Sequence, residues 1–212
     1  MLIKVCGLTR PADVRHCLEL DVDLVGFIFH APSPRSVSPD LAAGFPRGRA
    51  LRVGVFMRQS AQEVIRIMDR AGLDLAQLHG SYSPSDCRLI GPERVIKTFW
   101  PRRHERAESF QQELEAHASS CRTMLLDSGL SGGGHGERIQ SHWLSDVHVP
   151  RPWILAGGLG PDRVRDQVRK LKPDGIDLNS GVESSPGVKD AERIRRTLED
   201  INQRVECGNE KS

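Results

Sequence analysis

The sequence predicts an α/β fold, namely a single (β/α)8 TIM barrel of near-minimal length. Eight short apolar runs alternate with longer amphipathic or polar stretches from one end of the chain to the other. Most of these runs are almost continuously apolar, as expected of parallel strands that are covered on both faces. The chain has 212 residues, which is at the short end for this fold. Strands that alternate with helices imply parallel pairing through right-handed crossovers, and eight such units favour a closed barrel.

The eight candidate strands are short and spread along the whole chain. Each has four to seven residues, the usual length of a buried strand. Because the strands of such a barrel run parallel, the residues that end them are expected to gather at one mouth. The expected strands are Leu2–Cys6, Asp23–Phe29, Leu51–Phe56, Leu75–Leu78, Val95–Phe99, Thr123–Asp127, Trp153–Ala156 and Gly175–Asn179.

Helix-start signals lie between many of these strands. A proline or a small polar residue precedes each of five helix-like segments, which is the pattern of an N-cap or a first helical turn. In the last segment Ile194, Leu198 and Ile201 fall on one face. The expected helices are Ala12–Leu20 after Thr9 and Pro11, Ala61–Ala71 after Ser60, Ser85–Ile90 after Ser83 and Pro84, Arg163–Lys170 after Pro161 and Asp162, and a final helix opened by Asp190.

Two of the eight units are expected to be irregular. Four prolines in the second unit leave room for only a short helix, and a glycine-rich loop takes up much of the sixth connection. The barrel domain is expected to span residues 1–205. A polar tail, residues 206–212, is expected to be frayed.

The composition does not indicate a nucleic-acid or membrane partner. The net charge is only +2, from 30 basic and 28 acidic side chains, so the chain lacks the charge excess of a nucleic-acid-binding protein. No run approaches the ~20 apolar residues of a membrane span. We therefore expect no nucleic-acid partner and no membrane contact.

The cysteines indicate a reducing compartment. They are odd in number, widely scattered and form no C-x-x-C pair, which argues against a disulfide framework. A cytoplasmic location is therefore expected. The five are Cys6, Cys17, Cys87, Cys121 and Cys207.

Polar residues at the strand ends are the first candidates for an active site. Cys6 ends the first strand, His79 follows the fourth and Asp127 ends the sixth, while Arg35 follows the second and Asp177 lies in the eighth. Each also has a purely structural interpretation. The cysteine could fill a hole in the core, the aspartate could open a turn, the histidine could be a core residue and the arginine could lie on the surface.

Two glycine-containing stretches follow the last two strands. They are AGGLGPDRV and NSGVESSPG, and they include Gly158, Ser180 and Gly181. Barrels often bind phosphate with backbone N–H groups at these two loops, although glycine in a tight turn also has a steric explanation. The sequence therefore favours a phosphate site at this end of the barrel.

Several other chemistries are not supported by residue spacing. The sequence has no G-x-G-x-x-G after a strand and no P-loop. It has no H-E-x-x-H, and its eight histidines show no metal-ligand spacing. We expect an enzyme that uses neither a metal nor an organic cofactor.

Seven stretches occur in the order and spacing of one enzyme family: KVCGLTR, GFIFHAPSPRSVS, VGVF, QLHG, LLDS, ILAGGLGPDRV and DLNSGVESSPGVKD. From Ile3 to about Ile201 the chain resembles the phosphoribosylanthranilate isomerases of tryptophan biosynthesis. The resemblance implies a TIM barrel that converts N-(5-phosphoribosyl)anthranilate into the ribulose-phosphate aminoketone by an Amadori rearrangement. It also implies that the reaction needs no metal or organic cofactor.

The resemblance assigns a role to each candidate residue. Cys6 would be the general base and Asp127 the general acid, while Arg35 would hold the anthranilate carboxylate. The pocket-lining positions fall on His79 and Asp177, and the phosphate loops on Gly158, Ser180 and Gly181. A thiol must ionise to act as a base, so its pKa must be lowered. We expect the amino end of the helix after Thr9 and Pro11 to contribute.

The chain departs from the family pattern in two loops. Gly133, Gly134, His135 and Gly136, followed by Ile139, Gln140 and Ser141, replace the usual G-G-[ST]-G followed by Phe, Asp and Trp, and Ser81 and Tyr82 stand where an acidic pair is common. These changes bear on rate and affinity and leave the acid and base in place.

Two other functions remain open from the sequence. One is the related aminoaldose isomerase of histidine biosynthesis, or an enzyme that handles both substrates, although those barrels are expected to end their first strand in Asp. The other is a non-catalytic phosphosugar-binding barrel, which would need neither Cys6 nor Asp127. The sequence leaves a monomer and a homodimer equally open.

Overall fold

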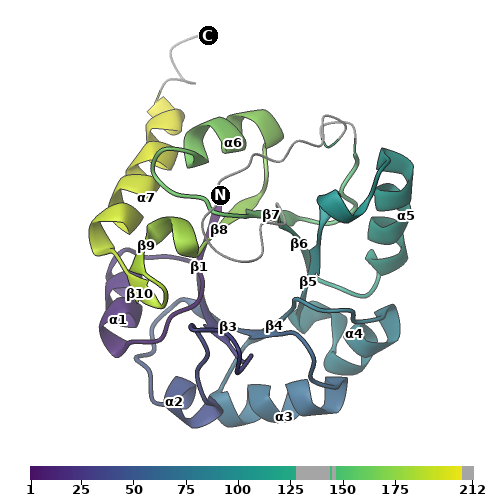
Figure 1. Cartoon of the computed structure of the whole chain (residues 1–212), viewed down its shortest axis with the longest axis horizontal. Coiled ribbons are helices and arrows are strands. Elements are labelled where there is room, and N and C mark those ends of the chain that lie inside the picture. Colours follow the sequence, from purple (N-terminus) through teal and green to yellow (C-terminus); the bar gives the residue numbers. More distant parts are fainter. Residues whose placement is uncertain (128–143, 145–146, 207–212) are drawn as a thin grey trace.

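Eight parallel strands form a closed barrel in the order of the chain (Figure 1). The computed structural model describes residues 1–127, 144 and 147–206, and for 202–206 the backbone alone. All eight predicted strands are present, with ends within one residue of the expected positions. They are β1 (Leu2–Val5), β2 (Leu24–Ile28), β3 (Leu51–Phe56), β4 (Leu75–Leu78), β5 (Val95–Phe99), β6 (Thr123–Asp127), β7 (Trp153–Ala156) and β8 (Gly175–Leu178).

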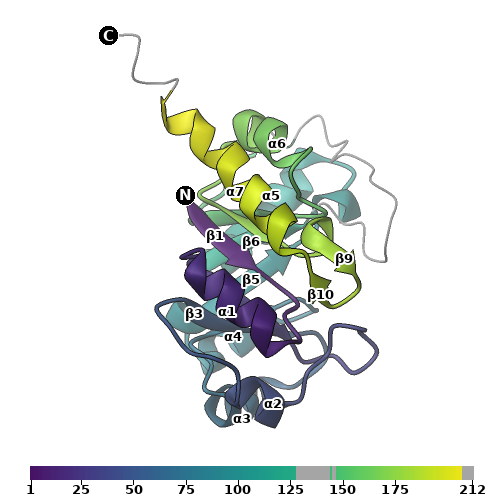
Figure 2. The same cartoon turned by 90° about the vertical axis from the view of Figure 1, so that its left-hand side faces the viewer.

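Helices surround the barrel, and α1 and α7 lie side by side next to β1 (Figures 1 and 2). The five predicted helices are present, and the second unit contains a short helix as expected. Within the described part of the chain no helix is long and apolar enough to cross a membrane. The helices are α1 (Pro11–Glu19), α2 (Pro39–Ala43), α3 (Ala61–Ala71), α4 (Pro84–Ile90), α5 (Ala107–His117), α6 (Val164–Leu171) and α7 (Ala191–Glu206), with 3-10 turns η1 (Pro92–Arg94), η2 (Pro101–Arg103) and η4 (Ser180–Val182).

Side-chain caps begin several of these helices as the sequence predicts. The Ser60 hydroxyl accepts a hydrogen bond from the Glu63 N–H at 3.3 Å at the start of α3. Ser83 forms a complete capping box with Asp86 at the start of α4. Helix α5 was not predicted, because the residue before it, Arg106, supplies no side-chain cap.

Thr9 does not cap α1, contrary to the start signal taken from the sequence. The N-cap residue of α1 is Arg10, which makes no side-chain capping bond, and Pro11 occupies the first helical position. The Thr9 hydroxyl instead donates to the Gly187 carbonyl at 2.6 Å. Thr9 therefore ties the loop after β1 to a segment near the end of the chain.

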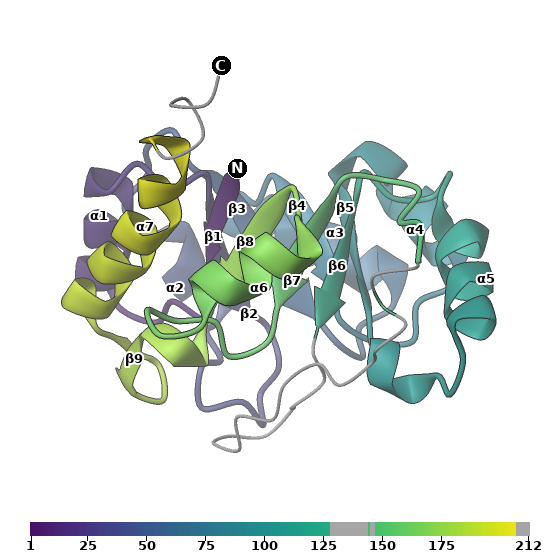
Figure 3. The ribbon, with the colours of Figure 1, turned by 90° about the horizontal axis from the view of Figure 1, so that it is seen from above.

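That segment is a small antiparallel hairpin that the sequence did not predict. It consists of β9 (Glu183–Ser185) and β10 (Val188–Lys189) and follows η4 directly. Figure 3 shows it at the opposite end of the barrel from the amino terminus. The hairpin thus lies at the carboxyl ends of the strands, where β1 and β8 also end.

The barrel interior is apolar at its amino end and polar above it. Lys4 of β1 and Asp177 of β8 are register partners and form an ion pair, so their side chains share one face of the sheet. This is the inner face, and the even-numbered residues of β1 point to it. Apolar side chains fill the interior near the amino ends of the strands. The polar side chains of the interior lie towards the carboxyl ends. The apolar interior cluster consists of Leu24, Val53, Leu75, Ile96, Leu125, Ile154 and Ala156.

Candidate active site

A cavity of about 460 Å³ opens at the carboxyl ends of the strands. Seven of the eight residues singled out in the sequence line it, although they come from six different strand ends. These are Cys6, Arg35, His79, Asp127, Gly158, Asp177 and Ser180. The eighth, Gly181, is not among the lining residues.

Cys6 reaches the cavity because the chain turns immediately after it. Gly7 has a φ of +72°, a conformation that L side chains rarely adopt. A Cβ on Gly7 would lie 2.7 Å from the Asn179 Oδ1 and 2.9 Å from the Arg35 Cδ. The glycine therefore allows Arg35, after β2, and Asn179, after β8, to pack against the backbone that follows Cys6.

The electrostatic environment of Cys6 is mixed. Burial raises the pKa of the Cys6 thiol, and the Lys4 and Lys189 ammonium groups oppose that rise while Asp177 adds to it. The sequence indicates only the amino end of the following helix as a group that would lower the pKa of Cys6. The structure adds two buried cations that no motif had indicated.

Asp127 lies at the end of β6, close to His79. The His79 Nε2 is 3.8 Å from the Asp127 Oδ2, and the imidazole meets the Trp100 ring edge-on, with centroids 5.0 Å apart. Burial lowers the pKa of His79 to about 4. The imidazole is therefore neutral at pH 7, so it can exchange hydrogen bonds with a substrate but brings no positive charge.

This neutral histidine makes the stability of the fold depend on pH. Between pH 6.5 and 4 His79 binds a proton in the unfolded chain but not in the folded chain. The contribution of neutral His79 to the free energy of unfolding is therefore complete above pH 6.5 and is lost as the pH falls towards 4. The expected loss is about 3 kcal/mol. Urea denaturation at pH 7, 5.5 and 4.5 should show the unfolding free energy of the wild type falling relative to that of His79→Gln towards acid pH. A difference that stays constant with pH would contradict this.

Three buried polar atoms around the cavity have no hydrogen-bond partner among the described residues. They are the Gln77 Oε1, the His79 Nδ1 and the Asp177 Oδ1. Leaving such atoms unpaired costs about 1–3 kcal/mol each, so sites that do so commonly serve a polar ligand or water. The cavity is therefore suited to a ligand with several hydroxyl groups.

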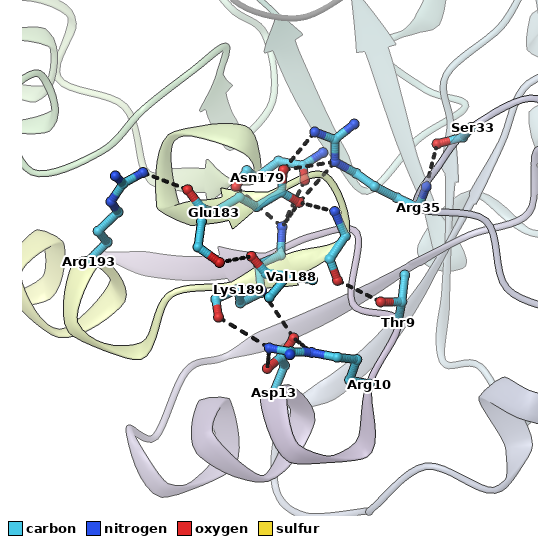
Figure 4. A network of polar contacts seen from close by, with 12 residues as sticks. Thr9, Arg10, Asp13, Ser33, Arg35, Asn179, Glu183, Val188, Lys189 and Arg193 are labelled. Carbon is cyan, nitrogen blue, oxygen red and sulfur yellow. Dashed lines mark hydrogen bonds and ion pairs between the residues drawn. The ribbon is translucent and has the colours of Figure 1, made fainter.

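Arg35 is held by a buried network from the β9–β10 hairpin (Figure 4). Its Nε and Nη2 donate to the two Glu183 carboxylate oxygens at 2.9 and 2.6 Å. The Lys189 Nζ donates to the same carboxylate at 2.8 Å and to the Asn179 Oδ1 at 2.9 Å. Burial alone would raise the pKa of Glu183, but the bonds from Arg35 and Lys189 hold it below its usual value. The guanidinium is thereby fixed at the cavity edge.

Three residues of this polar group, Lys4, Glu183 and Lys189, are not among the candidate site residues taken from the sequence. Lys4 is a charged residue within an apolar strand, two positions before Cys6. Because alternate residues of a strand face the same side, the sequence could have indicated that Lys4 faces the barrel interior with Cys6. Glu183 and Lys189 gave no comparable signal, since they belong to a hairpin that was not predicted.

The loops after β7 and β8 meet at the cavity edge. Gly158 has a φ of +63°, and a Cβ there would meet nothing within 4 Å. A Cβ on Gly181 would lie 2.0 Å from the Leu159 carbonyl oxygen. Gly181 is therefore the point where the two backbones touch, while Gly158 and Ser180 face the cavity.

Two stretches discussed in the sequence analysis fall outside the part of the chain that the structure describes. His135 and the rest of the glycine-rich stretch lie outside the described residues, as do residues 207–212. Among the residues that the structure describes, no group of three or more His, Cys, Asp or Glu side chains could hold a metal ion.

Comparison with known proteins gives a consistent result. Residues 3–200 match the family model described as N-(5'phosphoribosyl)anthranilate (PRA) isomerase. The N-(5'-phosphoribosyl)anthranilate isomerase of Desulfovibrio desulfuricans is 48% identical over 198 residues, which cover 93% of this chain and 94% of the relative.

Solved structures agree with the sequence matches. The phosphoribosyl anthranilate isomerase of Thermus thermophilus superposes with a TM-score of 0.82 at 33% identity, covering 96% of this chain and 99% of that one. Another isomerase, solved with reduced 1-(O-carboxyphenylamino)-1-deoxyribulose 5-phosphate, gives a TM-score of 0.77 at 27% identity, covering 96% of this chain and all of that one. With its closed barrel and its cavity at the strand ends, this chain belongs to the N-(5'-phosphoribosyl)anthranilate isomerase family.

Proposed function

We propose that the chain converts N-(5-phosphoribosyl)anthranilate into 1-(2-carboxyphenylamino)-1-deoxyribulose 5-phosphate in tryptophan biosynthesis, with Cys6 as general base and Asp127 as general acid. The observation that carries this is the meeting of a thiol from β1 and a carboxylate from β6 in one cavity. The relative that was solved with a reduced form of this product supports the substrate class.

The reaction needs one proton donor and one proton acceptor on different parts of the sugar. Asp127, protonated, gives its proton to the ribose ring oxygen as the C1–O bond breaks, which leaves an iminium between C1 and nitrogen. Cys6, as a thiolate, then removes the proton from C2, and those electrons neutralise the iminium to give an enolamine. Tautomerisation moves the C2 hydroxyl proton to C1 and yields the ketone, so no atom is gained or lost.

The ligand's hydroxyl groups have partners in the same cavity. The unpaired Asp177 Oδ1 and Gln77 Oε1 can accept hydrogen bonds from the sugar, and neutral His79 can exchange one without attracting an anion. Gly158 and Ser180 would receive the phosphate through backbone N–H groups, and Gly181 would keep their two loops in contact. Four free cysteines among the described residues support a cytoplasmic setting.

Arg35 would bind the anthranilate carboxylate with the part of the guanidinium that Glu183 does not occupy. Glu183 engages Nε and Nη2, so a second carboxylate approaches from the Nη1 side in a fixed orientation. Such a clamp acts on binding more than on the proton transfers.

Replacing Arg35 by alanine should therefore raise KM about 10- to 100-fold and lower kcat much less, because a charge-assisted pair contributes roughly 1.5–3 kcal/mol. Steady-state kinetics that follow the loss of substrate fluorescence would measure both constants. Arg70→Ala, which removes an exposed arginine paired with Asp40, is the matched control and should leave both unchanged. Unaltered kinetics in Arg35→Ala would contradict the contact.

The alternative functions are separated by one direct experiment. Purified protein is incubated with phosphoribosylanthranilate and, separately, with the aminoaldose of histidine biosynthesis. Turnover of the first alone supports the proposal, turnover of both indicates a dual-substrate enzyme, and turnover of the second alone would replace it. Tight binding of either without turnover would indicate a phosphosugar-binding barrel.

A further inference from the structure

We propose that Lys4 is a positioning residue that sets the ionisation of Cys6, with Asp177 anchoring its ammonium group beneath the thiol. As an account of catalysis this rests on the proposed function, because it assumes that Cys6 is the base. As an account of thiol ionisation it stands on the structure alone.

Lys4 lies on β1, and Cys6 follows directly after the last residue of that strand, so the two side chains are two positions apart and both face the barrel interior. The Lys4 side chain is 0% exposed, and its Nζ lies 2.9 Å from the Asp177 Oδ2. An ammonium group has three protons, and Asp177 accepts only one of them through this contact. The Lys4 Nζ and the Cys6 Sγ border the same small space, since a Cβ on Gly26 would lie 3.2 Å from the first and 2.8 Å from the second. The ammonium group is therefore paired with a carboxylate and lies close to the thiol.

A glycine on the neighbouring strand leaves room for this contact. Gly26 of β2 lies beside the pair, and a Cβ on it would stand 2.8 Å from the Cys6 Sγ and 3.2 Å from the Lys4 Nζ. Any side chain at position 26 would occupy the space that the two groups share. Sequence alone explains Gly26 as one small residue in a strand, whereas the structure places it against the proposed base.

The charged groups around Cys6 favour its ionised form. Lys4 on β1, Lys189 on β10 and Arg35 after β2 face it as cations, and Asp177 on β8 and Glu183 on β9 are the anions. This leaves one more positive than negative charge before the substrate enters. A buried site tolerates an unbalanced charge poorly, so a thiolate is less costly here than in apolar surroundings. Burial raises the pKa of Cys6, and Lys4 is the strongest opposing influence.

The test measures the thiol directly. The rate of iodoacetamide labelling at Cys6, followed by peptide mass spectrometry across pH, reports the pKa of that thiol without any substrate. In Lys4→Met we expect this pKa to rise by at least about one pH unit, since a neighbouring opposite charge shifts a pKa by roughly 1–3 units. We also expect kcat at pH 7 to fall about tenfold or more and to recover as the pH is raised. A purely structural role would lower kcat equally at every pH.

Lys97→Met is the matched control, because Lys97 is also buried but lies on β5 with its Nζ against the Gly80 and Thr98 carbonyls. It should leave the labelling pKa of Cys6 unchanged. If Lys4→Met does not fold, Asp177→Asn and the double variant Lys4→Met/Asp177→Asn are compared, since neither contains an unpaired buried carboxylate at position 177. The double variant should have the higher Cys6 pKa.

Equal labelling pKa values with and without Lys4 would overturn the inference. A shifted pKa in a protein that turns over no phosphoribosylanthranilate would uphold the role of Lys4 in thiol ionisation and would refute the proposed function. The two failures are therefore distinguishable.

Discussion

Cys6→Ser should lower kcat about 10²- to 10⁴-fold, the range attributed to a well-placed general base. Serine keeps the shape of cysteine and can remain in the closely packed space beside Gly26, so the fold should persist. Its hydroxyl, however, ionises far less readily than a thiol, so no base is available to take the C2 proton. The loss of substrate fluorescence in single-turnover experiments would measure the chemical step.

The control for this substitution is Cys17→Ser. Cys17 is another buried cysteine and lies on α1. The variant carries the same change outside the cavity, and its kcat should match the wild type. Because burial raises the pKa of Cys6, the wild-type kcat/KM should also rise with pH above neutrality as the thiolate forms. Brisk turnover by Cys6→Ser, or a wild-type profile that is flat above pH 7, would remove Cys6 as the base.

Asp127→Asn should reduce kcat by a comparable factor of about 10²–10⁴, because an amide cannot deliver the proton that ring opening requires. The amide has nearly the same shape and can keep a hydrogen bond to the ring oxygen, so KM should change little. Rapid mixing of the variant with substrate should show normal binding followed by slow loss of fluorescence.

Asp69→Asn, on the exposed side of α3, removes a carboxylate far from the cavity and serves as the control for Asp127→Asn. Its rate should equal that of the wild type. If Asp127→Asn turned over nearly as fast as the wild type, the acid would have to be sought elsewhere among the cavity residues.

The barrel could be predicted from the sequence because its strands are local patterns. Runs such as Leu51–Phe56 and Val95–Phe99 have the same bounds in the structure as in the prediction, since apolar strands are bracketed by turn residues. Caps at Ser60 and Ser83 were recognisable for the same reason. Helix α5 lacks such a cap and was therefore missed.

The positions of the proposed acid and base could be predicted from the sequence, but the residues that surround and hold the site could not. Cys6 and Asp127 stand at strand ends, and the topology of a barrel brings strand ends together. The Glu183 carboxylate that fixes Arg35 lies 148 residues farther along the chain. Its importance depends on a hairpin whose short strands carry no periodic pattern. The sequence predicts Gly181 as part of a phosphate loop, whereas in the structure it lies against the Leu159 backbone and does not line the cavity.

The β1–β8 pairing should be the last part of the barrel to form during folding. The residues paired there are far apart in the chain, and Lys4 and Asp177 are separated by 173 positions. Closing so long a loop is slow, because its entropy is lost before the contact forms. Refolding chains should therefore regain helical circular dichroism before they regain turnover. Fragments that lack the eighth strand keep Cys6 and Asp127 but lose the Asp177 carboxylate that pairs with the Lys4 ammonium.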